Sequence, residues 1–177
     1  MLEFLEKVSK PIKNYRNKYT YKSVFKEISD YFYRENYHSD ILAYYLQFEV
    51  VKKYFFEWIN KNIENKIIFE EYNNGEIVRE QDRIDILLYN NYQDRAIIIE
   101  NKSNNANDQF NQLFRYYKVL SNRKIKVDAI FYLNNNTLKE PNLSKLSSDE
   151  KKEIKELLVI GQLVEGNRSF DENVIKM

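Results

Sequence analysis

Apolar residues recur at three- and four-residue spacings between Tyr21 and Asn62. This period is typical of amphipathic helices, so we expect two helices here, or two and a half. Ser39 followed by Asp40 indicates a helix N-terminus, because serine can cap main-chain N–H groups and an acidic first turn suits the helix dipole. We therefore predict that the second helix begins at Ser39. The apolar positions are Val24, Ile28, Phe32, Ile41, Leu42, Tyr45, Leu46, Val50 and Phe55.

Strand-like runs follow the helices. Asn-Asn-Gly at 73–75 is a turn signal between two such runs. Residues 84–89 and 96–101 are then predicted to pair as a hairpin that 90–94 closes. This part of the chain therefore supplies three strands.

A further helix and strand complete the central pattern. Polar residues 103–108 lead into a predicted helix from about Asp108 to Leu120, and residues 126–133 are typical of a strand. The order helix, three strands, helix, strand indicates an α/β fold.

The pattern weakens after Pro141. Residues 147–160 open with serine and an acidic first turn, which predicts another helix, whereas residues 161–177 show little pattern. No repeat, low-complexity tract or linker marks a boundary. We expect a single domain over residues 1–177, made of N-terminal helices (1–62), a core (63–135) and a short C-terminal tail (136–177).

Composition narrows the available chemistry. The 177 residues include no Cys, one His and three Gly. Disulfides, thiol nucleophiles, cysteine zinc sites and two-histidine metal sites are excluded, and glycine-rich phosphate loops are absent. Apolar runs are too short for a membrane helix and no signal-peptide pattern opens the chain, so we expect a cytoplasmic protein without membrane partners. Carboxylate, lysine and hydroxyl chemistry remains.

The net charge of the chain says little about its partner. The chain has 28 Lys and Arg against 27 Asp and Glu, a net charge of +1. Basic clusters at 7–22 and 122–126 interleave with apolar or aromatic residues. Each cluster has two interpretations, a contact with nucleic acid or an ordinary solvated face, and net charge does not decide between them.

The hairpin carries the candidate chemistry. Side chains alternate along a strand, so Glu100 and Lys102 share a face, and Asp85 comes beside Glu100 if the register permits. Neighbouring carboxylates raise each other's pKa unless they share a cation, and Mg²⁺ commonly takes one or two protein carboxylates. An adjacent lysine could hold or deprotonate a water, or stabilise charge on a phosphate. The trio suits phosphodiester hydrolysis; the alternative is a surface salt bridge.

The predicted helix 108–120 lies close to these residues along the chain. Gln112 and Tyr116 are four residues apart and so share one face. We expect that face to be polar and to reach the same cleft, opposite the apolar stripe. The expected apolar stripe is Phe110, Leu113, Phe114, Tyr117 and Leu120, and the expected polar face is Asp108, Gln109, Gln112, Arg115 and Tyr116.

The run "IIIENK", followed by "DQ", "NQL" and "RYY", resembles the bacterial and phage branch of the PD-(D/E)XK nuclease superfamily. In this resemblance Asp85 stands at the motif's Asp, and Glu100 with Lys102 stand at its (D/E)XK. Gln112 and Tyr116 match the QxxxY element of RecB-like members. The stretch "ENYHSDILAYYL" is similar to the helical start of the branch, which matches Glu35 to a helix carboxylate.

The resemblance implies a restriction-endonuclease-like αβββαβ core, a mixed central sheet flanked by helices. It implies cleavage of DNA with Mg²⁺ or Mn²⁺. Asp85, Glu100 and Glu35 would bind metal, and Asp85, Glu100, Lys102, Gln112 and Tyr116 would form the catalytic set. The family's proline before the Asp is missing here, and relatives continue well past the fourth strand, which favours a chain truncated relative to the family.

Further residues have two interpretations each. His38 and Arg115 are candidate nucleic-acid contacts, or a hydrogen-bonding residue at a helix start and an exposed helical arginine. Trp58 is expected in the core, and stacking on a nucleic-acid base is the alternative. A homodimer is an expectation, because cutting both strands of a duplex needs two sites. The alternatives to a nuclease are a catalytically idle nucleic-acid-binding or assembly subunit that keeps the fold, and a structural protein that oligomerises through Tyr-rich surfaces.

Overall fold

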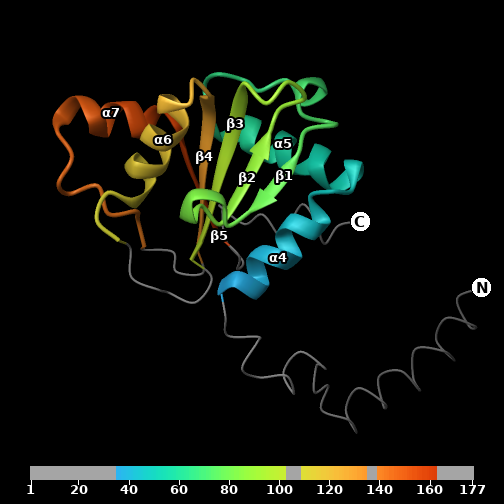
Figure 1. Ribbon diagram of the computed structural model, residues 1–177, viewed down its shortest axis with the longest axis horizontal. Coiled ribbons are helices and arrows are strands. Elements are labelled where there is room, and N and C mark those ends of the chain that lie inside the picture. Colours follow the sequence, from blue (N-terminus) through green and yellow to red (C-terminus); the bar gives the residue numbers. More distant parts are fainter. Residues whose placement is uncertain (1–34, 103–108, 135–138, 163–177) are drawn as a thin grey trace, which may run out of the picture. The chain divides into compact units, whose positions relative to one another are not determined.

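The computed structural model describes residues 35–102, 109–134 and 139–162 (Figure 1). The part of the first predicted helix before Glu35 lies outside these ranges. The helices are α4 (Glu35–Tyr45), α5 (Glu49–Asn62), α6 (Gln112–Asn122) and α7 (Ser148–Leu157), and the strands are β1 (Ile77–Arg79), β2 (Ile86–Tyr89), β3 (Arg95–Lys102), β4 (Lys126–Asn134) and β5 (Leu158–Gln162). Short 3-10 turns span Phe69–Glu71 and Gln81–Arg83.

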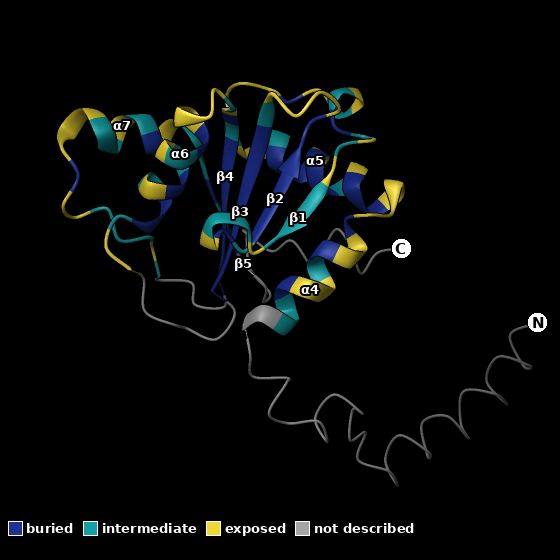
Figure 2. Ribbon diagram, in the orientation of Figure 1, coloured by how far each residue is buried: buried dark blue, intermediate teal, exposed yellow. Residues whose placement is uncertain are grey.

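The five strands form one mixed sheet in the order β1-β2-β3-β4-β5. The pairs β1–β2 and β2–β3 are antiparallel, whereas β3–β4 and β4–β5 are parallel. Helices cover both faces, and the central strands are buried (Figures 1 and 2). The α/β class and the αβββαβ order are therefore confirmed.

Each face of the sheet has its own apolar core. On one face the aromatic side chains of α5 pack against β3 and β4; Phe131 lies edge-on to Phe55 and to Trp58. Trp58 is 5% exposed, which confirms its predicted place in the core. On the other face α6 and α7 pack over the sheet, with Leu113, Leu120, Ile154, Ala96 and Ile98 among the buried residues. Alternation along β3 thus sends Ile97 and Ile99 to α5 and Ile98 to α6.

The hairpin has the predicted pairing. Ile86 pairs with Ile99 and Tyr89 with Ala96. Asn90 fixes the turn, because its Oδ1 accepts the main-chain N–H groups of Asp94 and Arg95, both at 3.1 Å. Asp85 immediately precedes the first pair, so the same register brings it opposite Glu100.

Two predicted element boundaries are wrong. Ser39 does not cap a helix: α4 begins at Glu35 and continues through Ser39, whose fully buried side chain faces the sheet. A short serine on the buried face of a helix gives the same local pattern as a cap, so the sequence alone does not separate them. The run before Asn-Asn-Gly is not a strand either, since the chain there makes a 3-10 turn at Phe69–Glu71.

The helix predicted from Asp108 begins at Gln112. Asp108 lies outside the described residues, and Asn111 before the helix has a left-handed backbone with φ of 52°. Phe110, expected in the apolar stripe, precedes the helix and is 60% exposed.

The C-terminal part contributes more than the sequence predicted. The expected helix is confirmed as α7, where Ser147 and Glu150 make a reciprocal capping box. The residues after it form β5, which pairs with β4 along its whole length. The sheet therefore extends beyond the residues 63–135 that the sequence assigned to the core.

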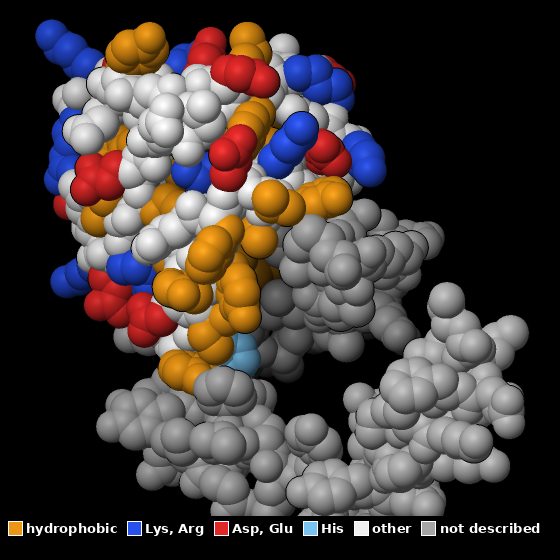
Figure 3. Space-filling view, turned by 90° about the vertical axis from the view of Figure 1, so that its right-hand side faces the viewer, with side chains coloured by type: hydrophobic (Ala, Val, Ile, Leu, Met, Phe, Trp, Pro, Cys, Tyr) orange, Lys and Arg blue, Asp and Glu red, His pale blue; other side chains and the backbone are white. Residues whose placement is uncertain are grey.

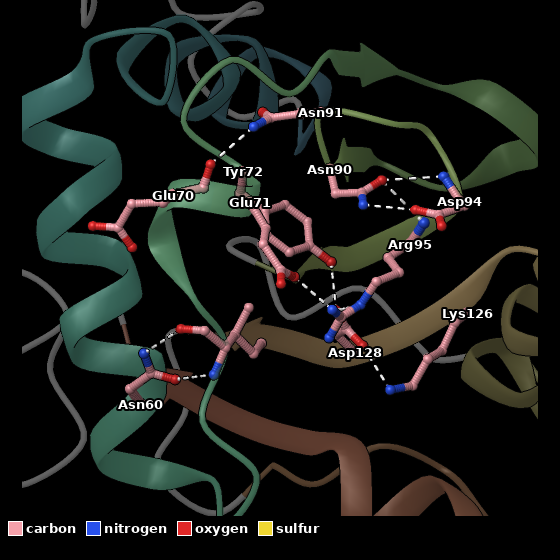
Figure 4. A network of polar contacts seen from close by, with 11 residues as sticks. Asn60, Glu70, Glu71, Tyr72, Asn90, Asn91, Asp94, Arg95, Lys126 and Asp128 are labelled. Atoms are coloured by element: carbon pink, nitrogen blue, oxygen red, sulfur yellow. Dashed lines mark hydrogen bonds and ion pairs between the residues drawn. The ribbon is translucent and has the colours of Figure 1, made fainter.

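A part-buried polar network lies where β3 and β4 begin (Figure 4). The side chain of Asp128 is 4% exposed; it accepts a hydrogen bond from the Tyr72 hydroxyl at 2.7 Å and pairs with Arg95 at 2.6 Å. Burial, and then the nearby Asp128 carboxylate, raise the pKa of Tyr72. Arg95 also pairs with Glu71. These contacts tie the 69–72 segment to the end of the sheet opposite Glu100 and Lys102.

Exposed apolar side chains gather on the outward side of α4 and the start of α5 (Figure 3). They are Ile41, Tyr44, Tyr45, Phe48 and Val50, each between 37% and 58% exposed. Tyr44 and Phe48 contact each other edge-on, with ring centroids 5.3 Å apart. α4 thus presents aromatic side chains to solvent while Ser39 and Ala43 face inward.

Candidate active site

The last residues of β3 place an acid and a base on one face of the sheet. Glu100 is fully buried and Lys102 is 6% exposed. Lys102 Nζ lies 2.7 Å from Glu100 Oε1. A charged pair with so little contact with water is unlike the surface salt bridge that was the alternative interpretation.

Asp85 joins this pair from the neighbouring chain segment. Its Oδ2 accepts the main-chain N–H of Asn101 at 2.8 Å. Burial raises the pKa of Asp85, and the charges of Lys102 and Arg79 oppose that shift, as does the Asn101 hydrogen bond. Asp85 therefore lies within the electrostatic reach of Lys102, at the residue just before β2.

α6, which packs on one face of the sheet, adds two further side chains to the site. Gln112 Nε2 lies 2.9 Å from Glu100 Oε1 and 2.6 Å from the Tyr116 hydroxyl. The Tyr116 hydroxyl in turn donates to the main-chain oxygen of Arg83 at 2.5 Å. Burial raises the pKa of Tyr116, and Glu100 and Asp85 raise it further. The two carboxylates therefore act on the same hydroxyl group.

The prediction that Gln112 and Tyr116 lie opposite the apolar stripe of α6 is wrong, although both side chains do reach the carboxylates as expected. Both are buried, on the same helix face as Leu113 and Leu120. Their polar ends find partners at Glu100 and at the Arg83 carbonyl, so burial leaves them hydrogen-bonded. Side-chain polarity alone predicted the opposite face.

α4 supports the site from the other face of the sheet. Ser39 Oγ accepts a hydrogen bond from Asn101 Nδ2 at 3.0 Å. Asp40 pairs with Arg79 at 2.8 Å, and Arg79 donates to the main-chain oxygen of Asp85. The sequence did not single out Arg79 or Asn101 as part of the site. One signal for Asn101 was present: a polar residue interrupts the apolar face formed by Ile97 and Ile99.

Two predicted residues, His38 and Arg115, lie outside the central cluster, and the side chain of a third, Glu35, is not among the described ones. Glu35 is the first residue of α4, one helical turn before Ser39, and its side chain is outside the described residues. His38 is half-buried in α4 and lies edge-on to Tyr37, with ring centroids 6.3 Å apart. Arg115 is exposed; it donates to Gln109 at 2.8 Å and lies over the Tyr116 ring.

The structure therefore brings five of the predicted residues together: Asp85, Glu100, Lys102, Gln112 and Tyr116. Across the described ranges, no group of three or more His, Cys, Asp or Glu side chains could hold a metal ion. Asp85 and Glu100 supply two carboxylates, which is the hard oxygen donor set that Mg²⁺ usually takes from a protein. The donor set thus fits a divalent metal that completes its shell with water and substrate oxygens.

A mixed sheet flanked by helices, with Glu100 and Lys102 at the carboxyl end of the central strand β3 and Asp85 just before the neighbouring β2, is the arrangement of a restriction-endonuclease-like fold. The model of the PD-(D/E)XK nuclease superfamily matches residues 23–165, and the chain belongs to that superfamily. No curated protein and no solved structure matches the chain. Membership indicates a nuclease acting on nucleic acid, in a superfamily that generally uses divalent metals.

Within residues 35–102, 109–134 and 139–162, no helix is both long enough and apolar enough to cross a bilayer.

Proposed function

We propose that this protein is a deoxyribonuclease that hydrolyses phosphodiester bonds with Mg²⁺ or Mn²⁺. The observation that carries the proposal is the trio that meets at the end of β3: the buried Glu100 and Lys102 are in contact at 2.7 Å, and the half-buried Asp85 lies opposite Glu100 in the hairpin register. Burying charged groups is costly, so a site that keeps them together fits a catalytic role better than a structural one.

In this proposal Asp85 and Glu100 hold the metal, and Glu35 from α4 contributes a third carboxylate. The bound metal would supply Lewis-acid stabilisation of the charge on the phosphate. The raised pKa of Asp85 reflects burial of its negative charge, which a shared cation would offset.

In the proposed reaction Lys102 holds the water molecule that attacks the phosphorus. Its ammonium group can donate hydrogen bonds to that water and to a phosphate oxygen, as its position beside Glu100 allows. The water oxygen forms a bond to phosphorus and gives up one proton, the bond from phosphorus to the leaving sugar oxygen breaks, and that leaving oxygen takes up one proton, so the net transfer is of one proton from the water to the leaving group. Gln112 and Tyr116 act as positioning residues, because they contact Glu100 and the segment before Asp85.

His38 and Arg115 are proposed contacts to the nucleic acid, since one lies in α4 and the other in the helix that carries Gln112. On duplex DNA we propose that a homodimer supplies one site for each strand.

A plasmid-cleavage assay tests the proposal. Wild-type protein should nick or cut supercoiled DNA with Mg²⁺ or Mn²⁺ and stop when EDTA is added. Asp85→Asn and Lys102→Met should each lose about a hundredfold or more in rate, because each removes a group that acts on the reacting phosphate. Thermal unfolding of every variant gives the folded fraction to which rates are normalised.

Lys118→Gln is the matched control, since Lys118 is an exposed lysine of α6 paired with Glu153 at 3.7 Å. It should cut as wild type does. Equal cutting by wild type, Asp85→Asn and Lys102→Met would overturn the assignment. Cleavage of RNA but not DNA in parallel reactions would overturn the substrate class alone.

A further inference from the structure

The segment before Asp85 has an unusual backbone. Glu80, Asp82 and Arg83 have φ values of 55°, 56° and 67°. This left-handed region is unfavourable for residues with a Cβ, and only Asn and Asp enter it with any frequency. Three such residues within four positions persist only where surrounding contacts hold them.

The contacts come mainly from α6. Arg123 forms a two-pronged ion pair with Asp82: Nη1 lies 2.6 Å from Oδ2 and Nη2 lies 2.7 Å from Oδ1. The Tyr116 hydroxyl holds the Arg83 carbonyl. From the sheet, the Tyr89 hydroxyl donates to Gln81 at 3.3 Å. Each residue from 81 to 83 is therefore tethered.

α6 also holds the other carboxylate. Gln112, its first residue, contacts Glu100, and Arg123 caps its last turn about 16 Å away. The three-turn helix α6 thus contacts Glu100 through its first residue and, further along, contacts the segment that leads to Asp85. Since a helix is stiff over this length, it can fix one carboxylate relative to the other.

We propose that Asp82 and Arg123 are a positioning pair: their two-pronged contact locks the strained 80–84 segment onto α6 and so sets Asp85 against Glu100. This inference rests on the proposed nuclease function. Neither residue touches the reacting atoms. Asp82 is 24% and Arg123 43% exposed, so the pair contributes little to global stability, and its effect should appear in activity.

The test is a double-mutant cycle on the full chain with Asp82→Asn, Arg123→Gln and both together. Asparagine tolerates the left-handed backbone as well as aspartate does, so Asp82→Asn removes charge without adding strain. The readouts are kcat and KM for DNA cleavage with Mg²⁺, the Mn²⁺ concentration at half-maximal activity, and the unfolding temperature. Lys118→Gln, which breaks a one-pronged pair on the same helix, is the control.

Each single variant should lower kcat about tenfold or raise the required Mn²⁺ concentration by a similar factor, as loss of residues that orient metal ligands does. The double variant should be no worse than either single one, and KM and the unfolding temperature should stay near wild type. Wild-type kcat and metal response in both variants would overturn the inference while leaving the nuclease function intact. An inactive wild-type protein would instead overturn the proposed function.

Discussion

Glu100 and Lys102 form a buried pair of opposite charges whose effect on stability can be measured. Both are buried, so each charge depends on the other for compensation. Removing one member of such a pair leaves an isolated buried charge, whereas replacing both with neutral groups of similar size is often tolerated.

Lys102→Met should therefore destabilise the metal-free protein by about 3–5 kcal/mol. Adding Glu100→Gln should restore most of this loss, because the isolated carboxylate is then gone. Urea unfolding of the three proteins measures the difference. A double variant as unstable as Lys102→Met alone would show that the two side chains do not depend on each other.

The contribution of the Tyr116 hydroxyl to stability can also be tested by substitution. Its hydroxyl donates to the Arg83 carbonyl and lies 2.6 Å from Gln112 Nε2. Tyr116→Phe removes that hydroxyl and leaves a part-buried carbonyl without this donor, which should cost about 1–3 kcal/mol in unfolding free energy. Tyr92→Phe is the control, because Tyr92 is 80% exposed. Equal losses in the two variants would contradict the role of this hydrogen bond.

The elements differ in how far the sequence predicted them. The hairpin was predicted, because alternation and the polar turn at 90–94 both indicate it, whereas its register was left open and is given by the structure. α6 was predicted as a helix, yet Gln112 and Tyr116 were placed on the wrong face. Their burial depends on partners at Glu100 and Arg83 that are distant in sequence, and periodicity carries no information about them.

The capping box of α7 is expected to make a pH-dependent contribution to the stability of the protein. The main-chain N–H and hydroxyl of Ser147 lower the pKa of Glu150 below its usual value. A carboxylate whose pKa is lowered in the folded state stabilises the fold above its unfolded pKa, and this stabilisation is lost as pH falls through the folded pKa. Wild type should be more stable than Glu150→Gln at neutral pH, with the difference shrinking below the usual range of glutamate. Thermal melts across pH measure it; a difference that grows on acidification would contradict the capping role.

In the molecule as a whole, the strand β5 is the element that the sequence did not predict. Leu158–Gln162 continues directly from α7, so its residues resemble the end of a helix until the sheet is assembled. Only the neighbouring β4, more than twenty residues earlier, identifies them as a strand. The core was predictable from local pattern, whereas the sheet's edge was not.

A substitution at Gly161 tests whether β5 packs against the aromatic core. A Cβ built there would lie 2.5 Å from the Phe131 ring and 3.1 Å from Trp58. Gly161→Ala should therefore destabilise the protein by about 1–3 kcal/mol through overpacking, measured by urea unfolding. A neutral or stabilising effect would place β5 away from the aromatic core.

Calorimetric titration with Mn²⁺ measures whether Asp85 and Glu100 bind a divalent metal. Wild type and Lys118→Gln should show a binding heat, and Asp85→Asn and Glu100→Gln, titrated where thermal melts show them folded, should lose it. A heat that persists unchanged in both carboxylate variants, or no heat in wild type, would exclude these two carboxylates as the metal site.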